Sequence, residues 1–281
     1  MTQKILKDRV AIITGASRGI GAAIARRFAA EGAHVALVAR TLEPRGDIEG
    51  SLTQTAESIR AAGAACATIQ ADLANPDDLP RIVDETMTAF GRIDILVNNA
   101  AWTRFPPVWE ASLRHVQLAF QMNAFTPHML SQLVFPHMKP QGEGWILNIS
   151  SATADLPSSA PWDFDNRLVQ YGRDGHAAIY GASKAALDRL TAGWAIELSG
   201  TGVAVNALAP VGAVATEGAM AVGGWNENDH VEPVEAMAEA ALQLCWRPAA
   251  TCSGEMARSI PLLQRLGVPV RMLDGSTLWK A

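Results

Sequence analysis

The chain has 281 residues, 49% of them hydrophobic, which is enough for one α/β domain with a sizeable core. Its net charge of −5, from 23 basic and 28 acidic residues, excludes a global attraction to nucleic acid or to an anionic membrane. Its three cysteines lack the spacing of a disulfide framework or a structural metal site. The sequence shows no secretory signal and no apolar run of the roughly 20 residues that a membrane span needs. We therefore expect a soluble, cytoplasmic, single-domain protein without a metal.

Short β-branched runs alternate along the chain with longer amphipathic or alanine-rich stretches. This alternation predicts strands at residues 9–14, 34–39, 66–70, 94–98, 144–149 and 203–209, and helices at residues 18–31, 51–62, 76–90, 113–138 and 177–198. Strands that are apolar throughout are typical of a parallel sheet with helices on both faces. Residues 41–50, 152–177 and 217–233 are rich in Gly, Pro, Asp, Asn or Ser, which predicts loops.

A glycine-rich turn follows the first predicted strand and opens the next helix, with the sequence Thr14-Gly-Ala-Ser-Arg-Gly-Ile-Gly21. Glycines at such a turn let backbone N–H groups approach a pyrophosphate, whose charge is stabilised by the helix N-terminus. The spacing is not that of the dinucleotide fingerprint G-x-G-x-x-G, and tight turns also need glycine when nothing binds. The turn therefore predicts a phosphate-binding loop, with a purely conformational role for the glycines as the alternative.

Tyr180 and Lys184 are four residues apart in a predicted helix, so their side chains project from one face. A phenol, with a reference pKa of about 10, exchanges protons poorly at neutral pH unless a nearby cation stabilises its phenolate. The chain's other tyrosine, Tyr171, has no such partner. The pair predicts a tyrosine general acid/base whose pKa is lowered by Lys184.

The turn at residues 14–21, Asn98-Asn-Ala100 and Tyr180-Gly-Ala-Ser-Lys184 together resemble the motifs of the short-chain dehydrogenase/reductase family in its single-domain form. The resemblance covers residues 8–259 and is greatest to the hydroxysteroid-dehydrogenase-like and terpenoid-alcohol enzymes. It implies a Rossmann-like, doubly wound parallel sheet in a three-layer α/β/α domain over residues 1–281. It also implies an oxidoreductase that interconverts an alcohol and its ketone or aldehyde by hydride transfer, and a homodimer or homotetramer.

The resemblance implies a set of cofactor-binding residues: Gly15, Ser17, Arg18, Gly19, Ile20, Gly21, Arg40, Asp72, Leu73, Asn99, Ala100, Tyr180, Lys184 and Thr216. The second strand ends in Arg40 rather than in the acid that bonds a ribose 2′-hydroxyl. Arg18 and Arg40 suit a doubly charged 2′-phosphate, which predicts NADP(H), with NAD as a possible substitute. The alternatives are that both arginines are solvated surface residues, and that Asp72 is a turn residue instead of a partner of adenine.

The resemblance implies four catalytic residues: Asn123, Ser151, Tyr180 and Lys184. Ser151 would orient the substrate oxygen, with Ser150 as its competitor, and Lys184 would also hold the ribose. Asn123 would hold a water in a proton relay to Lys184, although an asparagine on a helix is usually a surface residue. Thr216 would bond the nicotinamide amide.

The chain departs from the family pattern between Ser151 and Tyr180, whose long separation indicates an insertion within residues 152–179. Apolar residues of this insertion, including Trp162 and Phe164, could form a pocket wall for a small apolar carbonyl or alcohol, or an oligomer contact; we favour the pocket. Residues 217–232 are expected to form a second substrate loop, in which residues 218–229, with Trp225, act as a lid, and a disordered surface loop is the alternative. A sensor or scaffold that binds a dinucleotide without turnover, and a lyase or epimerase, remain as alternative functions.

Overall fold

The apolar runs form a seven-stranded parallel sheet with the order β3-β2-β1-β4-β5-β6-β9. The strands are β1 (Val10–Thr14), β2 (His34–Ala39), β3 (Cys66–Gln70), β4 (Ile95–Asn98), β5 (Gly144–Ile149), β6 (Val203–Ala209) and β9 (Met256–Arg258). A separate parallel pair joins β7 (Ala213–Val214) to β8 (Val231–Glu232). The computed structural model describes residues 4–44, 49–217, 220 and 231–280. The strand order reverses between β1 and β4, which is where open α/β sheets bind their ligands.

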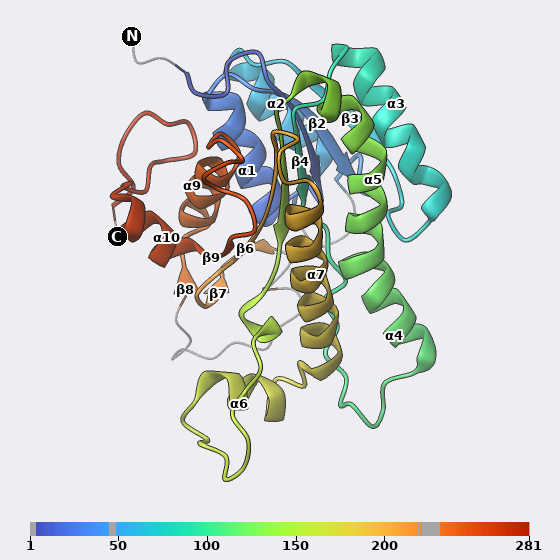
Figure 1. The fold of residues 1–281 in the computed structure, drawn as a ribbon, viewed down its shortest axis with the longest axis vertical. Helices are drawn as coiled ribbons and strands as arrows, with labels where there is room; N and C mark the ends of the chain where they lie inside the picture. Colours follow the sequence, from blue (N-terminus) through green and yellow to red (C-terminus); the bar gives the residue numbers. More distant parts are fainter. Residues whose placement is uncertain (1–3, 45–48, 218–219, 221–230, 281) are drawn as a thin grey trace.

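Helices cover both faces of this sheet (Figure 1). The first face carries α1 (Gly19–Ala30), α2 (Leu52–Ala61), α9 (Val234–Leu244) and α10 (Ser259–Leu266). The second face carries α3 (Leu79–Phe90), α4 (Leu113–Phe120), α5 (Thr126–Met138) and α7 (Ala178–Glu197). The helix α6 (Arg167–Arg173) projects beyond the lower end of α7 in Figure 1.

Two hydrophobic cores result from the alternation of strand side chains between the two faces. In β1, Ala11 and Ile13 belong to the core beneath α1 and α9, whereas Ile12 belongs to the core beneath α3 and α5. All three side chains are fully buried. The predicted fold class is therefore confirmed as a single Rossmann-like α/β domain with three layers.

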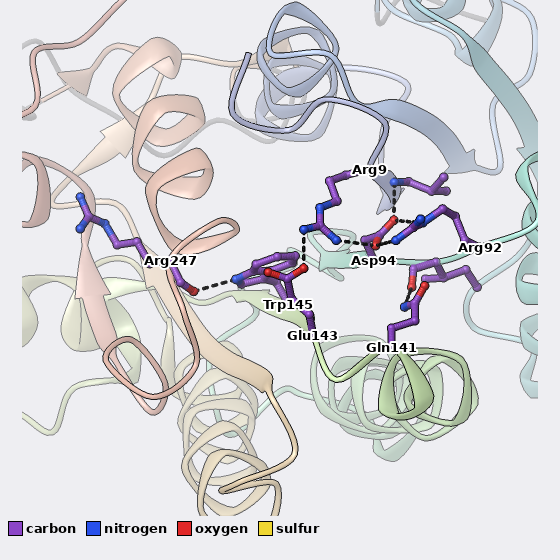
Figure 2. A network of polar contacts seen from close by, with 9 residues as sticks. Arg9, Arg92, Asp94, Gln141, Glu143, Trp145 and Arg247 are labelled. Atoms are coloured by element: carbon purple, nitrogen blue, oxygen red, sulfur yellow. Dashed lines mark hydrogen bonds and ion pairs between the residues drawn. The ribbon is translucent and has the colours of Figure 1, made fainter. Parts of the chain in front are cut away.

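A buried carboxylate ties the amino ends of the strands together (Figure 2). Asp94 has no exposed surface and accepts hydrogen bonds from the backbone N–H of Val10 at 2.8 Å and from Arg9 at 3.1 Å. Arg92 adds two bonds at 2.6 and 2.9 Å, and Arg9 also pairs with Glu143. This network joins the amino ends of β1, β4 and β5. They lie at the end of the sheet opposite the motif residues.

The structure differs from the sequence-based prediction in three segments. The single helix expected at residues 113–138 consists of α4 and α5 joined by a π-helical turn, Gln121–Phe125. Residues 152–177 were expected to be loop, but they contain the 3-10 turn Ala152–Ala154 and α6, whose start is capped by Asn166. The sequence analysis also did not predict β9, α9 or α10.

Three further expectations concern a lid, membrane-spanning helices and metal sites. The predicted lid at residues 218–229 lies outside the described residues, apart from residue 220. Among the helices that are described, none is both long and apolar enough to cross a bilayer. The described part of the chain also holds no group of three or more His, Cys, Asp or Glu that could bind a metal ion.

Candidate active site

The glycine turn between β1 and α1 has the backbone geometry that a close ligand approach requires. Gly15 and Gly19 have φ angles of +67° and +57°, a region that side-chain-bearing residues rarely adopt. A Cβ atom on Gly21 would lie 2.4 Å from the carbonyl oxygen of Gly15. Because α1 begins at Gly19, its first N–H groups face the turn and form an anion site.

The ends of β1 and β4 are held together beside this turn. The Oγ1 atom of Thr14 accepts hydrogen bonds from the N–H groups of Asn99 and Ala100, at 3.0 and 3.1 Å. The Asn99 side chain donates to the carbonyls of Thr14 and Gly15, at 2.9 and 3.3 Å. In the described contacts, Asn99 and Ala100 thus hold the glycine turn at the switch point.

A carboxylate of the chain itself lies on this turn. The N–H of Gly19 donates to Oε2 of Glu217 at 3.0 Å, and Thr216 packs so closely that a Cβ on Gly19 would lie 3.1 Å from it. A helix N-terminus that accepts a carboxylate has the donors and field needed for a phosphate. The residues present therefore fit a pyrophosphate, and Glu217 is a site residue that the sequence analysis missed.

The two arginines assigned to the 2′-phosphate have different surroundings. Arg18 donates to the carbonyl of Gly50 at 2.8 Å, while its buried Nε atom has no hydrogen-bond partner. Arg40 is exposed at the end of β2. Neither forms an ion pair among the described residues, and a cavity of about 780 Å³ opens beside Ser17, Arg18, Gly19 and Thr216. An orphaned guanidinium N–H beside a cavity fits an anionic ligand.

Asp72 and Leu73, which follow β3, make hydrogen bonds within the chain. Asp72 is exposed, and its Oδ1 atom accepts from the N–H of Ala74 at 3.1 Å, as in a turn. Leu73 is buried, and its carbonyl accepts a 2.7 Å hydrogen bond from Thr126. Both residues follow the carboxyl end of β3. The contact that Asp72 makes with Ala74 is the one expected of a turn residue.

The catalytic candidates come together from β5 and α7. Ser151 directly follows β5, and its hydroxyl accepts hydrogen bonds from the N–H and Oγ1 of Thr153 at 3.2 and 2.9 Å. The same hydroxyl lies close enough to the phenol of Tyr180 to lower its pKa. The close approach needs Gly181, because a Cβ there would lie 2.5 Å from the carbonyl oxygen of Thr153. Phe105 packs edge-on against the Tyr180 ring, with a centroid separation of 5.3 Å and an interplanar angle of 76°. The structure therefore aligns a serine hydroxyl with a phenol beside an aromatic wall.

Lys184 lies one helical turn farther along α7 and is buried. Its Nζ atom donates to the carbonyl of Ile149 at 2.7 Å and lies 5.9 Å from the centroid of the Tyr180 ring. The side chain is 2% exposed. Burial lowers the pKa of the Lys184 amine to about 8, against the opposing effect of the Asp188 carboxylate.

The protein residues alone do not lower the pKa of Tyr180. Burial raises it to about 12, and the nearby hydroxyl of Ser151 offsets only part of that rise. This corrects the expectation that Lys184 makes the phenol more acidic, because the desolvation of the phenolate outweighs a cation that lies 5.9 Å from the ring. At neutral pH the phenol of Tyr180 therefore carries its proton.

Asn123 lies in the π-helical turn and has no exposed surface. Its amide oxygen accepts from the N–H of Trp102 at 2.8 Å. Its amide nitrogen donates to the Trp102 carbonyl at 3.1 Å and to the Ser183 hydroxyl at 3.0 Å. Asn123 is thus not a surface residue, and its side chain ties the loop after β4 to helix α7, which carries Tyr180 and Lys184.

The insertion presents several of its apolar side chains to solvent. Leu156 is 89% exposed, and Trp162 and Phe164 are 46% and 48% exposed. The guanidinium of Arg173 lies 4.5 Å from the centroid of the Phe164 ring. The insertion also touches the loop after β4, where the rings of Trp109 and His176 meet edge-on at 6.2 Å. The insertion, which begins after Ser151 at the end of β5, therefore lies beside the loop after β4.

The family model for short chain dehydrogenases matches residues 9–161 and 170–227, most of the chain. The chain belongs to the short-chain dehydrogenase/reductase family. An uncharacterized oxidoreductase of Mycobacterium tuberculosis (strain CDC 1551 / Oshkosh) is 38% identical to this short-chain dehydrogenase over 206 residues. Those residues cover 73% of this chain and 69% of the relative. The protein is therefore an oxidoreductase of this family.

Solved structures share the fold of this short-chain dehydrogenase almost throughout. A 7α-hydroxysteroid dehydrogenase in complex with NADH and 7-oxo glycochenodeoxycholic acid superposes with a TM-score of 0.75 at 26% identity, covering 100% of this chain and 98% of its own. A metagenomic short-chain oxidoreductase in complex with NADP has a TM-score of 0.70 at 29% identity, covering 90% and 98%. The similar folds thus include one complex with each nicotinamide cofactor.

Two site residues escaped the sequence analysis for different reasons. Asp188 follows Lys184 by four residues, so the helical spacing that identified Tyr180 and Lys184 would also have found it. Glu217 had no such signal. Its contact with Gly19 joins residues 198 positions apart, which only the folded chain brings together.

Proposed function

We propose that this protein is an NADP-dependent oxidoreductase that interconverts an alcohol and its ketone or aldehyde, with Tyr180 as general acid/base. The observation that supports this most directly is the approach of the Ser151 hydroxyl to the phenol of Tyr180, one helical turn from the buried amine of Lys184. A scaffold that only binds a dinucleotide has no need to bring these three groups together. The proposal also retains Asn123, as the residue that fixes the catalytic helix.

Each residue has a defined task in this reaction. The nicotinamide, when bound, supplies or accepts the hydride. The Ser151 hydroxyl holds the substrate oxygen, and Tyr180 gives that oxygen a proton in reduction or removes one in oxidation. With its pKa raised to about 12, the phenol carries its proton at neutral pH but is a weak acid. Proton transfer in either direction therefore requires positive charge near the phenol, and the Lys184 ammonium is the protein's own source of it.

The assignment of NADP rests on charge at the adenosine end of the site. Arg18 and Arg40 lie at the carboxyl ends of β1 and β2, and no described carboxylate pairs with either. A guanidinium binds a phosphate monoester through charge-assisted hydrogen bonds, which a ribose hydroxyl cannot match. We extend the proposal to Thr216 as a partner of the nicotinamide amide, and to Asp72, Leu73, Asn99 and Ala100 as the lining of the adenosine side.

The substrate and the assembly are proposed from the exposed apolar surface. A small apolar carbonyl or alcohol compound suits the wall formed by Phe105 beside Tyr180. The exposed Leu156, Trp162 and Phe164 extend that wall, or they form a contact in a homodimer or homotetramer. A cytoplasmic location agrees with the free state of Cys66, Cys245 and Cys252.

The test replaces the phenol hydroxyl and leaves the ring. Y180F should lower kcat for the reduction of a bulky apolar ketone by about 100-fold or more, measured as loss of NADPH absorbance, while the Kd for NADPH changes little. Y171F is the matched control, because it removes the same hydroxyl from the chain's only other tyrosine. If Y180F kept a tenth of the wild-type turnover while it bound NADPH normally, the assignment of Tyr180 would be wrong.

A further inference from the structure

A second polar cavity lies beside helix α7, between the carboxyl ends of β5, β6 and β9. It has a volume of about 240 Å³ and is lined by Ser150, Asp155, Asp188, Arg258 and four apolar residues. These polar groups come from four elements, the end of β5, the turn that follows it, helix α7 and the end of β9. Neither Tyr180 nor the glycine turn contributes to the lining, so this cavity is separate from the predicted dinucleotide site.

Two polar atoms at this cavity are buried without a hydrogen-bond partner. They are Oγ of Ser150 and Oδ1 of Asp188. Burial raises the pKa of the Asp188 carboxyl, and the nearby hydroxyl of Ser150, a residue that is only 5% exposed, offsets part of that rise. Buried polar atoms are almost always satisfied in native proteins, so two orphans at one cavity indicate a role other than packing.

Asp188 stands one helical turn from Lys184, on the same face of α7. Side chains at this spacing are neighbours, and an opposite charge at such a distance favours the charged form of each group. The carboxylate raises the pKa of the Lys184 amine, and burial is the larger effect that lowers it. Asp188 is therefore the protein's own counter-charge to the buried amine.

The other titratable groups near Asp188 do not replace it as the counter-charge to Lys184. Arg258, from β9, is bonded to the carboxylate of Asp155, which follows the 3-10 turn after β5. Arg258 lowers the pKa of Asp188 and Asp155 raises it, so the two partly cancel there. Tyr180, the remaining titratable group beside Lys184, keeps its proton at neutral pH and contributes no charge.

We propose that Asp188 is a positioning residue for the reaction proposed above, whose carboxylate holds the buried Lys184 side chain as an ammonium ion. Burial opposes the ionised form of this carboxylate, and the Ser150 hydroxyl and the charge of Lys184 favour it. Asp188 touches neither substrate nor cofactor and acts only through Lys184. Loss of its charge shifts the pH range in which the lysine is charged, and hence the range in which the active site functions.

The experiment follows the lysine directly, in the protein without any dinucleotide. The chain has five lysines, and the other four, at positions 4, 7, 139 and 280, are exposed. In protein labelled with ¹³C at the lysine ε-carbons, only Lys184 should therefore titrate near pH 8, and K184M assigns its signal. D188N should move that titration to lower pH by roughly one unit or more, and D188E should restore it.

D155N is the matched control, because Asp155 lines the same cavity but is paired with Arg258. It should leave the Lys184 titration near the wild-type value. The proposal is overturned if D188N leaves the titration unchanged, or if D155N shifts it as far as D188N does. Circular dichroism checks the fold of each variant, and D188S, which also removes the charge, replaces D188N if that variant does not fold.

Enzyme kinetics separate this proposal from the proposed function on which it rests. If the Lys184 titration and the limb of the kcat–pH profile both move to lower pH in D188N, both proposals gain support. If the titration moves while the profile stays fixed, Asp188 controls Lys184 as proposed, but the catalytic assignment of Lys184 is wrong. A structural role alone would lower stability without moving either curve.

Discussion

The buried carboxylate of Asp94 makes a large and specific contribution to stability that a single substitution exposes. D94N keeps the shape of the side chain but removes its charge, and it turns one acceptor oxygen into an NH₂ donor. In the wild type the carboxylate accepts hydrogen bonds from three groups, the N–H of Val10 and the guanidiniums of Arg9 and Arg92. The NH₂ group of asparagine cannot accept any of these bonds. The substitution therefore removes one charge-assisted hydrogen bond or more and leaves two cations without a counter-charge at this position.

The magnitude follows from the burial of each partner. Breaking a fully buried ion pair costs about 3–5 kcal/mol. Here only Asp94 is buried, whereas the side chains of Arg9 and Arg92 are 27% and 44% exposed and regain water. We therefore expect D94N to lower the free energy of unfolding by about 2–3 kcal/mol. For a chain of 281 residues this lowers Tm by about 3–5 °C.

The assay is urea unfolding followed by circular dichroism, with D174N as the control. Asp174 also pairs with an arginine, Arg173, but both side chains are more than half exposed, and removal of such a pair should leave stability unchanged. The kcat of folded D94N should equal that of the wild type, because Asp94 lies at the sheet edge opposite Tyr180. A D94N midpoint that matches the D174N midpoint would refute this reasoning.

Three further outcomes concern the ligand site and its charges. E217A should tighten NADPH binding about fivefold in a fluorescence titration, because the carboxylate no longer competes for the Gly19 N–H; weaker binding would contradict this. R40A should lower kcat/KM for NADPH roughly tenfold and leave the value for NADH unchanged, and an equal loss with both cofactors would argue against a 2′-phosphate contact. The folded pKa of Lys184, about 8, lies below its usual 10.5, so the unfolded chain binds more protons between these pH values. The unfolding free energy of the wild type relative to K184M should therefore rise as the pH increases from 8 to 10.5, and a flat difference would mean that the amine is not desolvated.

Much of the fold could be predicted from local patterns, because its strands are buried on both faces. The run Val10–Thr14 is apolar up to its final threonine and entirely buried, which is the signature of a central parallel strand. The strand Met256–Arg258 escaped prediction because it has three residues and pairs only along β6, with an exposed methionine. Short edge strands form because a neighbour supplies the hydrogen bonds, and this neighbour lies about 50 positions earlier in the chain.

The candidate site, like the fold, could be predicted from the sequence only in part. The spacing of Tyr180 and Lys184 placed both on one helix face, and the structure brings Ser151 to them. The contacts of the Asn123 side chain could not be predicted, because its two partners, Trp102 and Ser183, lie 21 and 60 residues away. Residue types also could not show that Glu217 bonds the N–H of Gly19.

The sequence by itself determined the order of strands and helices, the glycine turn and the helical spacing of the phenol and the amine, since these depend on neighbours within a few residues. Only the tertiary structure decided the protonation of these groups. Burial raises the pKa of Tyr180 to about 12 and lowers that of Lys184 to about 8, reversing the expected sign for the phenol. Desolvation depends on how much of the whole molecule surrounds a group, and no local pattern of residues contains that information.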